Sequence, residues 1–503
     1  MKVKNKKLIF FLIIIVSIIF FCIRELFFGI SQLLSGNTVV GSFYNTGPFG
    51  GYLSVCVSVL MPFCFYYKKY IYKSVIIRVI HSIASIVSII ALIILPSTLS
   101  RSAFLALGCS MFILVKRKNV RGLYTLFRQK PTGIIIAICV LVALAYLIKK
   151  PSADGRFLME KISLNIILEN KHRGVGNGYF GGVYGEEQAN YFKKQIDSKG
   201  INDMDWNALN EKERLIADCP KYPFNEYLYI GIQYGTIAMF SVLLITILLL
   251  VITYKRDYIC FFGFNTLAIF SLFSYPFHFI EFHILLSILI IAFVFSMIQT
   301  PHDGIEKRKD LTNRMTLLLM ATVLIFVFTT TILKIFEVNR QKLDENKLNT
   351  IKQLYAMEYY DYFVEECEKA LPTYNKNEDF LYIYGLTLSK KGNHEKCDSI
   401  LKIGSKISSN PIFWNEMGNN YLLMKKYREA EECYKHAFYM IPNRLYPLSL
   451  LAKLYDAEGD TVRFLDMADK VESFVPKVES VRTERLRSEI RELKLGYISS
   501  LDK

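Results

Sequence analysis

The chain has 503 residues, of which 52% are hydrophobic, and its formal net charge is +16 at pH 7. Long apolar runs fill the sequence before residue 335, whereas charged residues interrupt the apolar ones after it. Runs of ~18 or more apolar residues are typical of transmembrane helices, so this composition excludes a wholly soluble protein.

Nine apolar stretches predict membrane-spanning helices, because only a helix satisfies its own backbone polar groups in hydrocarbon. They are residues 8–30, 47–66, 75–96, 99–115, 132–148, 227–253, 258–276, 279–298 and 315–335. The first stretch follows a basic start, but it is longer than the apolar region of a signal peptide and no small-x-small cleavage site follows it. We therefore expect a retained first span.

The distribution of Lys and Arg predicts the orientation of these spans. With the N-terminus inside, the basic short segments all fall inside: 1–7, 67–74, 116–131, 254–257 and 299–314. The short outside segments 31–46 and 277–278 contain no Lys or Arg. This asymmetry follows the positive-inside rule, so the basic excess is mostly topological and no nucleic-acid partner is expected. The loop 149–226 and everything after residue 335 then lie outside.

The region after residue 335 contains an internal repeat. Its clearest copy matches the tetratricopeptide pattern of large and small helix-packing residues at Trp414, Gly418, Tyr421, Ala430, Tyr434, Ala437 and Pro442. The pattern recurs 33 residues earlier from Leu381 and 34 residues later from Leu448, and a helix at 355–371 adds a partial unit. We expect a separable α-solenoid domain over 336–503 that binds a protein partner or shields the outer face of the membrane domain.

The ten cysteines are scattered along the chain and form no CxxC motif or His-Cys cluster. This arrangement predicts neither a metal site nor a disulfide framework. Three of them, Cys367, Cys397 and Cys433, fall at helix-packing positions of the repeats. We expect these three to be small residues of the core.

Polar residues gather at the outer ends of the predicted spans, where charge near hydrocarbon is costly and marks a pathway or a site. The hairpin between the third and fourth spans contains Ser100 and Arg101, and the loop 149–226 opens with Arg156. The same loop continues through a glycine-rich turn and returns to the membrane through Pro223-Phe-Asn-Glu-Tyr.

In their order, sidedness and spacing these pieces resemble the O-antigen ligase family of lipid-linked glycan transferases. The resemblance covers about residues 40–300 and rests on Gly41–Pro48 at the second span, Ser100, Arg101, Gly155, Arg156, Gly174, Gly176, Asn225 and Gly235. It implies transfer of a glycan from an undecaprenyl-diphosphate carrier to a lipid, glycan or protein acceptor. It also places the outer face in the periplasm of a bacterial inner membrane.

The resemblance implies that Arg101 and Arg156 bind the diphosphate. The planar guanidinium matches phosphate oxygens and stays charged, so it would stabilise the leaving group in an inverting displacement at the anomeric carbon without a metal or another cofactor. The alternative without a catalytic role is that these arginines extend their charged groups to the membrane surface or only set the topology.

The sequence departs from the family pattern at the expected general base. The motif usually begins His-Asn, and here Phe224 stands at the histidine position while Asn225 and Gly235 are retained. We expect Asn225 and Glu226 to orient the acceptor, with Glu226 replacing the missing base. His172 and His278 are the other candidates, although a lone histidine is more often structural. The chain also has one span before the Asn45 stretch, where the family has several.

The sequence therefore predicts an all-α protein with a polytopic bundle at 1–335 and repeats at 336–503. The first expected function is O-antigen ligase-like transfer, as in lipopolysaccharide biosynthesis. A polysaccharide polymerase or a protein O-oligosaccharyltransferase is a sister activity that the sequence does not separate from it. The rival from another class is a non-catalytic membrane anchor that displays an interaction domain. A transporter is a weaker third alternative, because internal pseudo-repeats are absent from the sequence.

Overall fold

The computed structural model describes residues 2–67, 74–118, 150–170, 172–199, 205–298 and 346–501, with a few positions between 325 and 336. Every regular element in these described segments is a helix, in agreement with the predicted all-α class. The chain forms two compact units. Unit 1 comprises 1–148, 224–227 and 240–341, and unit 2 comprises 149–223, 228–239 and 342–503.

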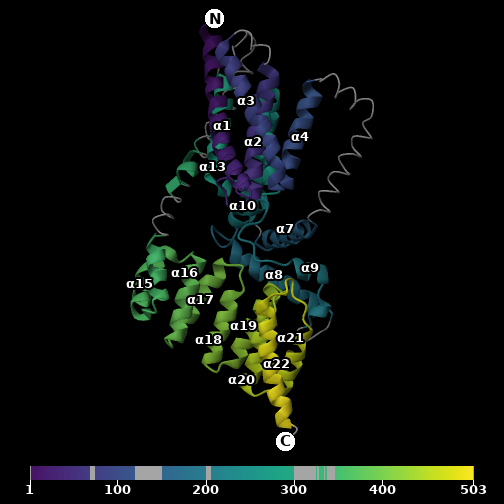
Figure 1. The fold of residues 1–503 in the computed structure, drawn as a ribbon, viewed down its shortest axis with the longest axis vertical. Coiled ribbons are helices and arrows are strands. Elements are labelled where there is room, and N and C mark those ends of the chain that lie inside the picture. The colour runs from purple at the N-terminus through teal and green to yellow at the C-terminus, as the bar shows by residue number, and fades with distance from the viewer. Residues whose placement is uncertain are drawn as a thin grey trace. The chain divides into compact units, whose positions relative to one another are not determined.

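Unit 1 is built around one central helix. Its main helices are α1 (Lys2–Leu34), α2 (Thr46–Tyr67), α3 (Val75–Ile94), α4 (Arg101–Lys118), α12 (Tyr258–Ser271) and α13 (Ile280–Ile298). Helix α2 packs against α1, α3, α4 and α12, and Figure 1 shows α1 to α3 running side by side. This position explains why α2 carries fully buried residues along its length, among them Leu53, Cys56 and Leu60.

Four helices are long and apolar enough to cross a membrane: Phe11–Leu34, Thr46–Tyr66, Val75–Thr98 and Thr236–Arg256. They coincide with four of the nine predicted spans.

Five predicted spans are not matched in this way. The spans 258–276 and 279–298 correspond to the shorter apolar helices α12 and α13, and 99–115 corresponds to α4, whose ends carry Arg and Lys. The span 132–148 and most of 315–335 lie outside the described residues.

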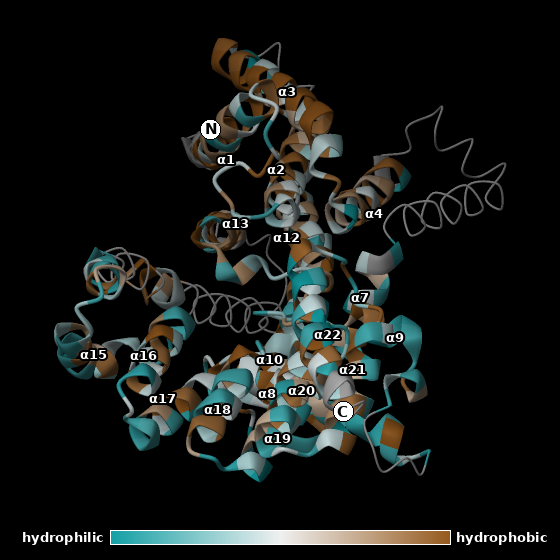
Figure 2. Ribbon diagram, turned by 60° about the horizontal axis from the view of Figure 1, so that its bottom comes forward, coloured by the Kyte–Doolittle hydropathy of each residue, from teal (hydrophilic) through white to brown (hydrophobic). Residues whose placement is uncertain are grey.

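Helix α3 is apolar on both its buried and its exposed faces. Ala84 and Ala91 are fully buried, whereas Ile76, Ile86 and Ile93 are 66%, 56% and 71% exposed. Figure 2 colours most of this helix as hydrophobic. Large aliphatic side chains exposed in this way favour an apolar environment on the outer side of the helix, such as a lipid bilayer.

The C-terminal part of unit 2 is a succession of helices in which each packs against the next. They are α15 (Tyr360–Tyr374), α16 (Glu378–Lys390), α17 (His394–Ile407), α18 (Ile412–Leu423), α19 (Tyr427–Met440), α20 (Tyr446–Glu458), α21 (Thr461–Ser473) and α22 (Val481–Leu501). The helix predicted at 355–371 is displaced. The chain turns at 357–359, with Glu358 in the left-handed region at φ 61°, and α15 begins only afterwards.

The small residues of the repeat pattern lie at close helix–helix contacts. A Cβ at Gly385 would lie 2.6 Å from Leu401 Cδ2, and one at Gly418 would overlap the ring of Tyr434. These contacts join α16 to α17 and α18 to α19, so the predicted reason for the small residues is confirmed. Cys367, Cys397 and Cys433 are buried, as predicted.

The segment predicted as an outer loop is largely helical. It contains α7 (Lys150–Asn170), α8 (Phe180–Asp197) and the short α9 (Glu211–Ile216), followed by α10 (Glu226–Tyr234) and α11 (Thr236–Arg256). Sequence analysis grouped this segment with the membrane domain, but 149–223 share their compact unit with 342–503.

Helix α8 packs directly on α17 and α19 through glycines. A Cβ at Gly181 or Gly182 would overlap the carbonyl group of Ile407 or Lys406, so only glycine permits this approach. The buried amide of Gln188 donates to the carbonyl oxygens of Met440 and, at 3.0 Å, of Asp218. Helix α8 is therefore part of the same core as the C-terminal helices.

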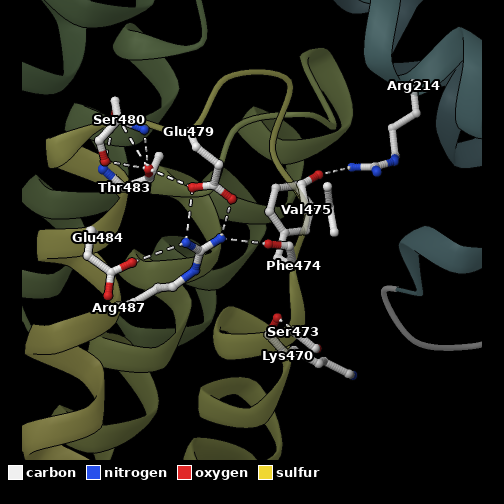
Figure 3. Close-up of polar contacts among 10 residues, drawn as sticks. All are labelled: Arg214, Lys470, Ser473, Phe474, Val475, Glu479, Ser480, Thr483, Glu484 and Arg487. Atoms are coloured by element: carbon white, nitrogen blue, oxygen red, sulfur yellow. Dashed lines mark hydrogen bonds and ion pairs between the residues drawn. The ribbon is translucent and has the colours of Figure 1, made fainter.

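A buried arginine joins the end of α9 to the same helices. Arg214 Nη1 donates to the carbonyl oxygen of Val475 at 3.1 Å, as Figure 3 shows, and the guanidinium lies 5.2 Å from the centre of the Phe474 ring. Asn443 Nδ2 donates in turn to the carbonyl oxygens of Arg214 and Ala217 at 2.9 and 2.8 Å. Figure 3 also shows Arg487 of α22 paired with Glu479 and Glu484.

Candidate functional site

The predicted site residues fall into two groups, one in each unit. Arg101, Asn225 and Glu226 belong to unit 1, and Arg156 belongs to unit 2. Arg101 is half-buried at the first position of α4, and Arg156 is half-buried on α7. Each group is therefore described within its own unit.

The hairpin that carries Arg101 is held against α2 by hydroxyl groups. Thr98 Oγ1 accepts a hydrogen bond from the Ser100 backbone N–H at 3.2 Å, and Ser100 Oγ donates to the Gly47 carbonyl at 3.4 Å. Between them Leu99 is in the left-handed region at φ 49°, a conformation that costs a non-glycine residue roughly 1–3 kcal/mol. The predicted residue Ser100 thus fixes the turn, and the turn places Arg101 at the positive end of α4.

Glu226 is a buried carboxyl group. The residue is about 5% exposed, its Oε2 atom has no hydrogen-bond partner in the described part of the chain, and His278 Nδ1 lies 4.0 Å from that atom. Burial raises the pKa of Glu226 to about 8, against a smaller opposing effect of the Phe277 backbone N–H that donates to it. The carboxyl group therefore exchanges a proton close to neutral pH.

Aromatic rings gather around His278, the neighbour of this carboxyl group. The Tyr275 ring lies 5.2 Å from Phe224 and 5.6 Å from His278, measured between ring centroids. Asn45 Nδ2 donates to the Tyr275 hydroxyl at 3.4 Å, which joins the Gly41–Pro48 stretch to the same cluster. Phe224, at the position of the expected histidine, thus packs on Tyr275. Tyr275 was not predicted from the sequence, although it stands next to Pro276 in the turn before α13.

Asn225 has a clear local role. Its Oδ1 atom accepts a hydrogen bond from the Tyr227 backbone N–H at 3.1 Å, so it caps the N-terminus of α10. The cap fixes the direction in which Glu226 leaves the backbone. Asn225 therefore positions the candidate base.

The motif glycines of unit 2 form a tight crossing of two chain segments. Gly174, Gly176 and Gly235 all have positive φ, at 55°, 91° and 90°. The Gly176 N–H donates to the Gln233 carbonyl at 3.0 Å, and a Cβ at Gly235 would overlap the His172 carbonyl oxygen. Gly235 also ends α10, so the predicted span 227–253 is two helices instead of one.

His172 lies at this crossing and is exposed. Its Nδ1 atom is 3.0 Å from Thr236 Oγ1, at the start of α11. This contact gives His172 a structural role at the crossing. Of the two candidate histidines, only His278 lies beside Glu226.

No protein-family model matches the chain, and no curated protein matches it. The functional assignment therefore rests on the residues and contacts described above.

Proposed function

We propose that the protein is a membrane glycosyltransferase of the O-antigen ligase type. It moves a glycan from an undecaprenyl-diphosphate carrier to an acceptor at the periplasmic face of a bacterial inner membrane. In this proposal the nine predicted spans hold the site in the outer leaflet, and the helical pairs after residue 345 form a tetratricopeptide-like solenoid. Sugar identity and acceptor class are open within the proposal.

The observation that carries it is the buried carboxyl group of Glu226, with the half-buried His278 beside it. General acid–base catalysis works best with a group whose pKa is near the working pH. The pKa of Glu226, raised to about 8, meets that condition, and His278 Nδ1 lies beside the carboxyl group at 4.0 Å. A carboxyl group of this kind compensates for the absence of a histidine at Phe224.

The proposed reaction is a displacement at the anomeric carbon. The acceptor hydroxyl oxygen bonds to that carbon, its proton passes to the ionised form of Glu226, and the bond to the undecaprenyl-diphosphate oxygen breaks. Arg101, held at the positive end of α4, supplies positive charge for the departing diphosphate. Arg156 is assigned to the same diphosphate by the family resemblance alone.

A second candidate function is a non-catalytic membrane anchor. The specific observation in its favour is that Ser100, Gly174, Gly176 and Gly235, four of the motif residues, have evident structural roles in the turn and in the chain crossing. In this alternative the same geometry serves to present unit 2 to a partner.

The test compares Glu226→Gln with Glu187→Gln in cells and in isolated membranes. Glu187 is a matched control, because it is also about 5% exposed and lies on α8 of unit 2, whereas Glu226 belongs to unit 1. We expect Glu226→Gln to reduce glycan transfer by on the order of a hundredfold or more and to cause the lipid-linked donor to accumulate.

Glu187→Gln should transfer normally at equal membrane levels. Phe224→His in the Glu226→Gln background should restore part of the activity. Normal transfer by Glu226→Gln would refute the acid–base assignment. Unchanged donor levels after deletion of the gene, together with loss of a protein complex, would favour the anchor.

A further inference from the structure

Helix α7 has two apolar faces, and only one of them is buried in the described structure. The first face packs on α8 and α9 (Figure 1), and its residues Ile162 and Ile166 are fully buried. On the opposite side Phe157 and Leu168 are 72% and 70% exposed, and Leu164 between them is 48% exposed. We call Phe157, Leu164 and Leu168 the α7 stripe.

The α7 stripe follows the axis of the helix. Its members are spaced by seven and then four positions, about two turns and one turn of an α-helix, so the three side chains point in the same direction. Lys161 has the same register, and its Nζ atom donates to the Tyr191 hydroxyl at 2.6 Å and to Glu213 Oε1 at 3.2 Å. A single exposed leucine needs no explanation, whereas large apolar side chains aligned in this way indicate a contact surface.

Both ends of α7 are joined to segments that enter the membrane. The helix begins at Lys150, two residues after the predicted span 132–148, which itself lies outside the described residues. At the other end, the segment that follows α7 contacts the start of α11, where His172 Nδ1 is 3.0 Å from Thr236 Oγ1. Helix α11 is long and apolar enough to cross a membrane.

These two attachments limit the direction of α7. Its 21 residues correspond to a helix about 31 Å long. Because each end lies next to a point where the chain enters the membrane, the axis runs along the membrane surface instead of away from it. An apolar stripe on such a helix is typical of interfacial helices, whose apolar side chains enter the boundary between headgroups and acyl chains.

The dimensions of the stripe favour lipid over a protein partner. Specific protein interfaces bury about 800 Å² on each partner, which is more than a row of three side chains supplies. A bilayer needs no matching groove and accepts a narrow row of apolar groups.

We propose that α7 is an interfacial helix whose stripe inserts Phe157, Leu164 and Leu168 into the outer leaflet of the bilayer. The segment predicted from the sequence as an outer loop is then bound to the membrane surface along its first helix, which also carries Arg156. This inference does not depend on glycan transfer, and it holds equally for a non-catalytic anchor.

The test uses the full-length protein in vesicles of three parts phosphatidylethanolamine to one part phosphatidylglycerol, with plain or brominated acyl chains. Leu164→Trp and Leu168→Trp each add a fluorophore on the stripe to the two native tryptophans. Ile86→Trp, on the exposed apolar face of α3, is the reference for lipid contact, and Leu423→Trp, an exposed leucine of α18, is the matched control. We expect brominated lipid to quench the added fluorescence at both stripe positions, as at Ile86→Trp, and to leave Leu423→Trp unchanged.

A second variant tests whether the stripe itself holds the helix in the lipid. Phe157→Trp should be quenched by brominated lipid, and adding Leu164→Gln and Leu168→Gln to it should reduce that quenching. The thermal midpoint of this triple variant in detergent should equal that of Phe157→Trp, because the two leucines are exposed in the folded chain, and this separates lost lipid contact from misfolding.

Absence of quenching at both stripe positions would overturn the proposal, whether water, another protein or a second copy of the chain covers the stripe. Equal quenching of Leu423→Trp would also overturn it, because the contact would then not be particular to α7.

Discussion

Replacing Glu226 by Gln should change how the stability of unit 1 depends on pH. The folded-state pKa of this carboxyl group is about 8, against a reference value of 4.5. Between these values the folded state binds the proton and the unfolded state does not, so stability falls as pH rises and the contribution is fully lost above pH 8. One pKa unit corresponds to about 1.4 kcal/mol, so the loss between pH 6 and pH 8 is roughly 2 kcal/mol. Gln does not titrate and should remove this slope.

The assay is thermal unfolding of the wild type and Glu226→Gln in detergent at several values between pH 6 and pH 9. Other groups titrate over this range, including His278 at 4.0 Å, so the quantity of interest is the difference between the two midpoints. That difference should shift in favour of the Gln variant as pH rises. Glu187→Gln serves as the control for loss of a buried carboxyl group elsewhere. Parallel curves for the wild type and Glu226→Gln would show that Glu226 is not protonated at neutral pH, and the acid–base assignment would lose its basis.

Three other predictions follow from the same geometry. Arg101→Lys and Arg156→Lys keep the charge but lose the planar fork, so each should reduce transfer on the order of a hundred- to a thousandfold at near-normal membrane levels, whereas topology-setting arginines would tolerate Lys. Gly235→Ala places a Cβ on a residue at φ 90° and against the His172 carbonyl, and should lower the free energy of unfolding by at least about 2 kcal/mol, measured by denaturant titration. A periplasm-active reporter fused after residue 345 should be active and one at residue 120 silent, and activity at residue 120 would refute the orientation.

The sequence patterns predicted those parts of the fold that depend on residues close together in the chain. Long apolar runs predicted the four helices that are long and apolar enough to cross a membrane, and the spacing of small residues predicted the helix pairs. Both signals arise within one helix or between adjacent helices. The break at Gly235 was hidden by the apolar residues on both sides of it, although the glycine itself was singled out. A glycine within an apolar run signals an interruption only when another chain segment crosses it, as the His172 carbonyl does here.

These patterns did not predict contacts between segments that are far apart in the sequence. The Gln188 side-chain amide donates a hydrogen bond to the Met440 carbonyl oxygen. The hydrophobic periodicity of the two helices does not predict this contact. The burial of Glu226 is similar. Its sequence position one residue after Asn225 made it a candidate, but its raised pKa depends on the packing of 224–227 against the 275–278 turn, which only the structure reveals.

These distant contacts change how the C-terminal helices are to be understood. Sequence analysis posed partner binding and shielding as alternatives for residues 336–503. Helix α8 packs on α17 and α19, and Asn443 donates to the Ala217 carbonyl oxygen at 2.8 Å. Both contacts lie within unit 2, so they make residues 149–223 part of the same core as the C-terminal helices. Partner binding and shielding of the membrane domain both stay predictions for these helices.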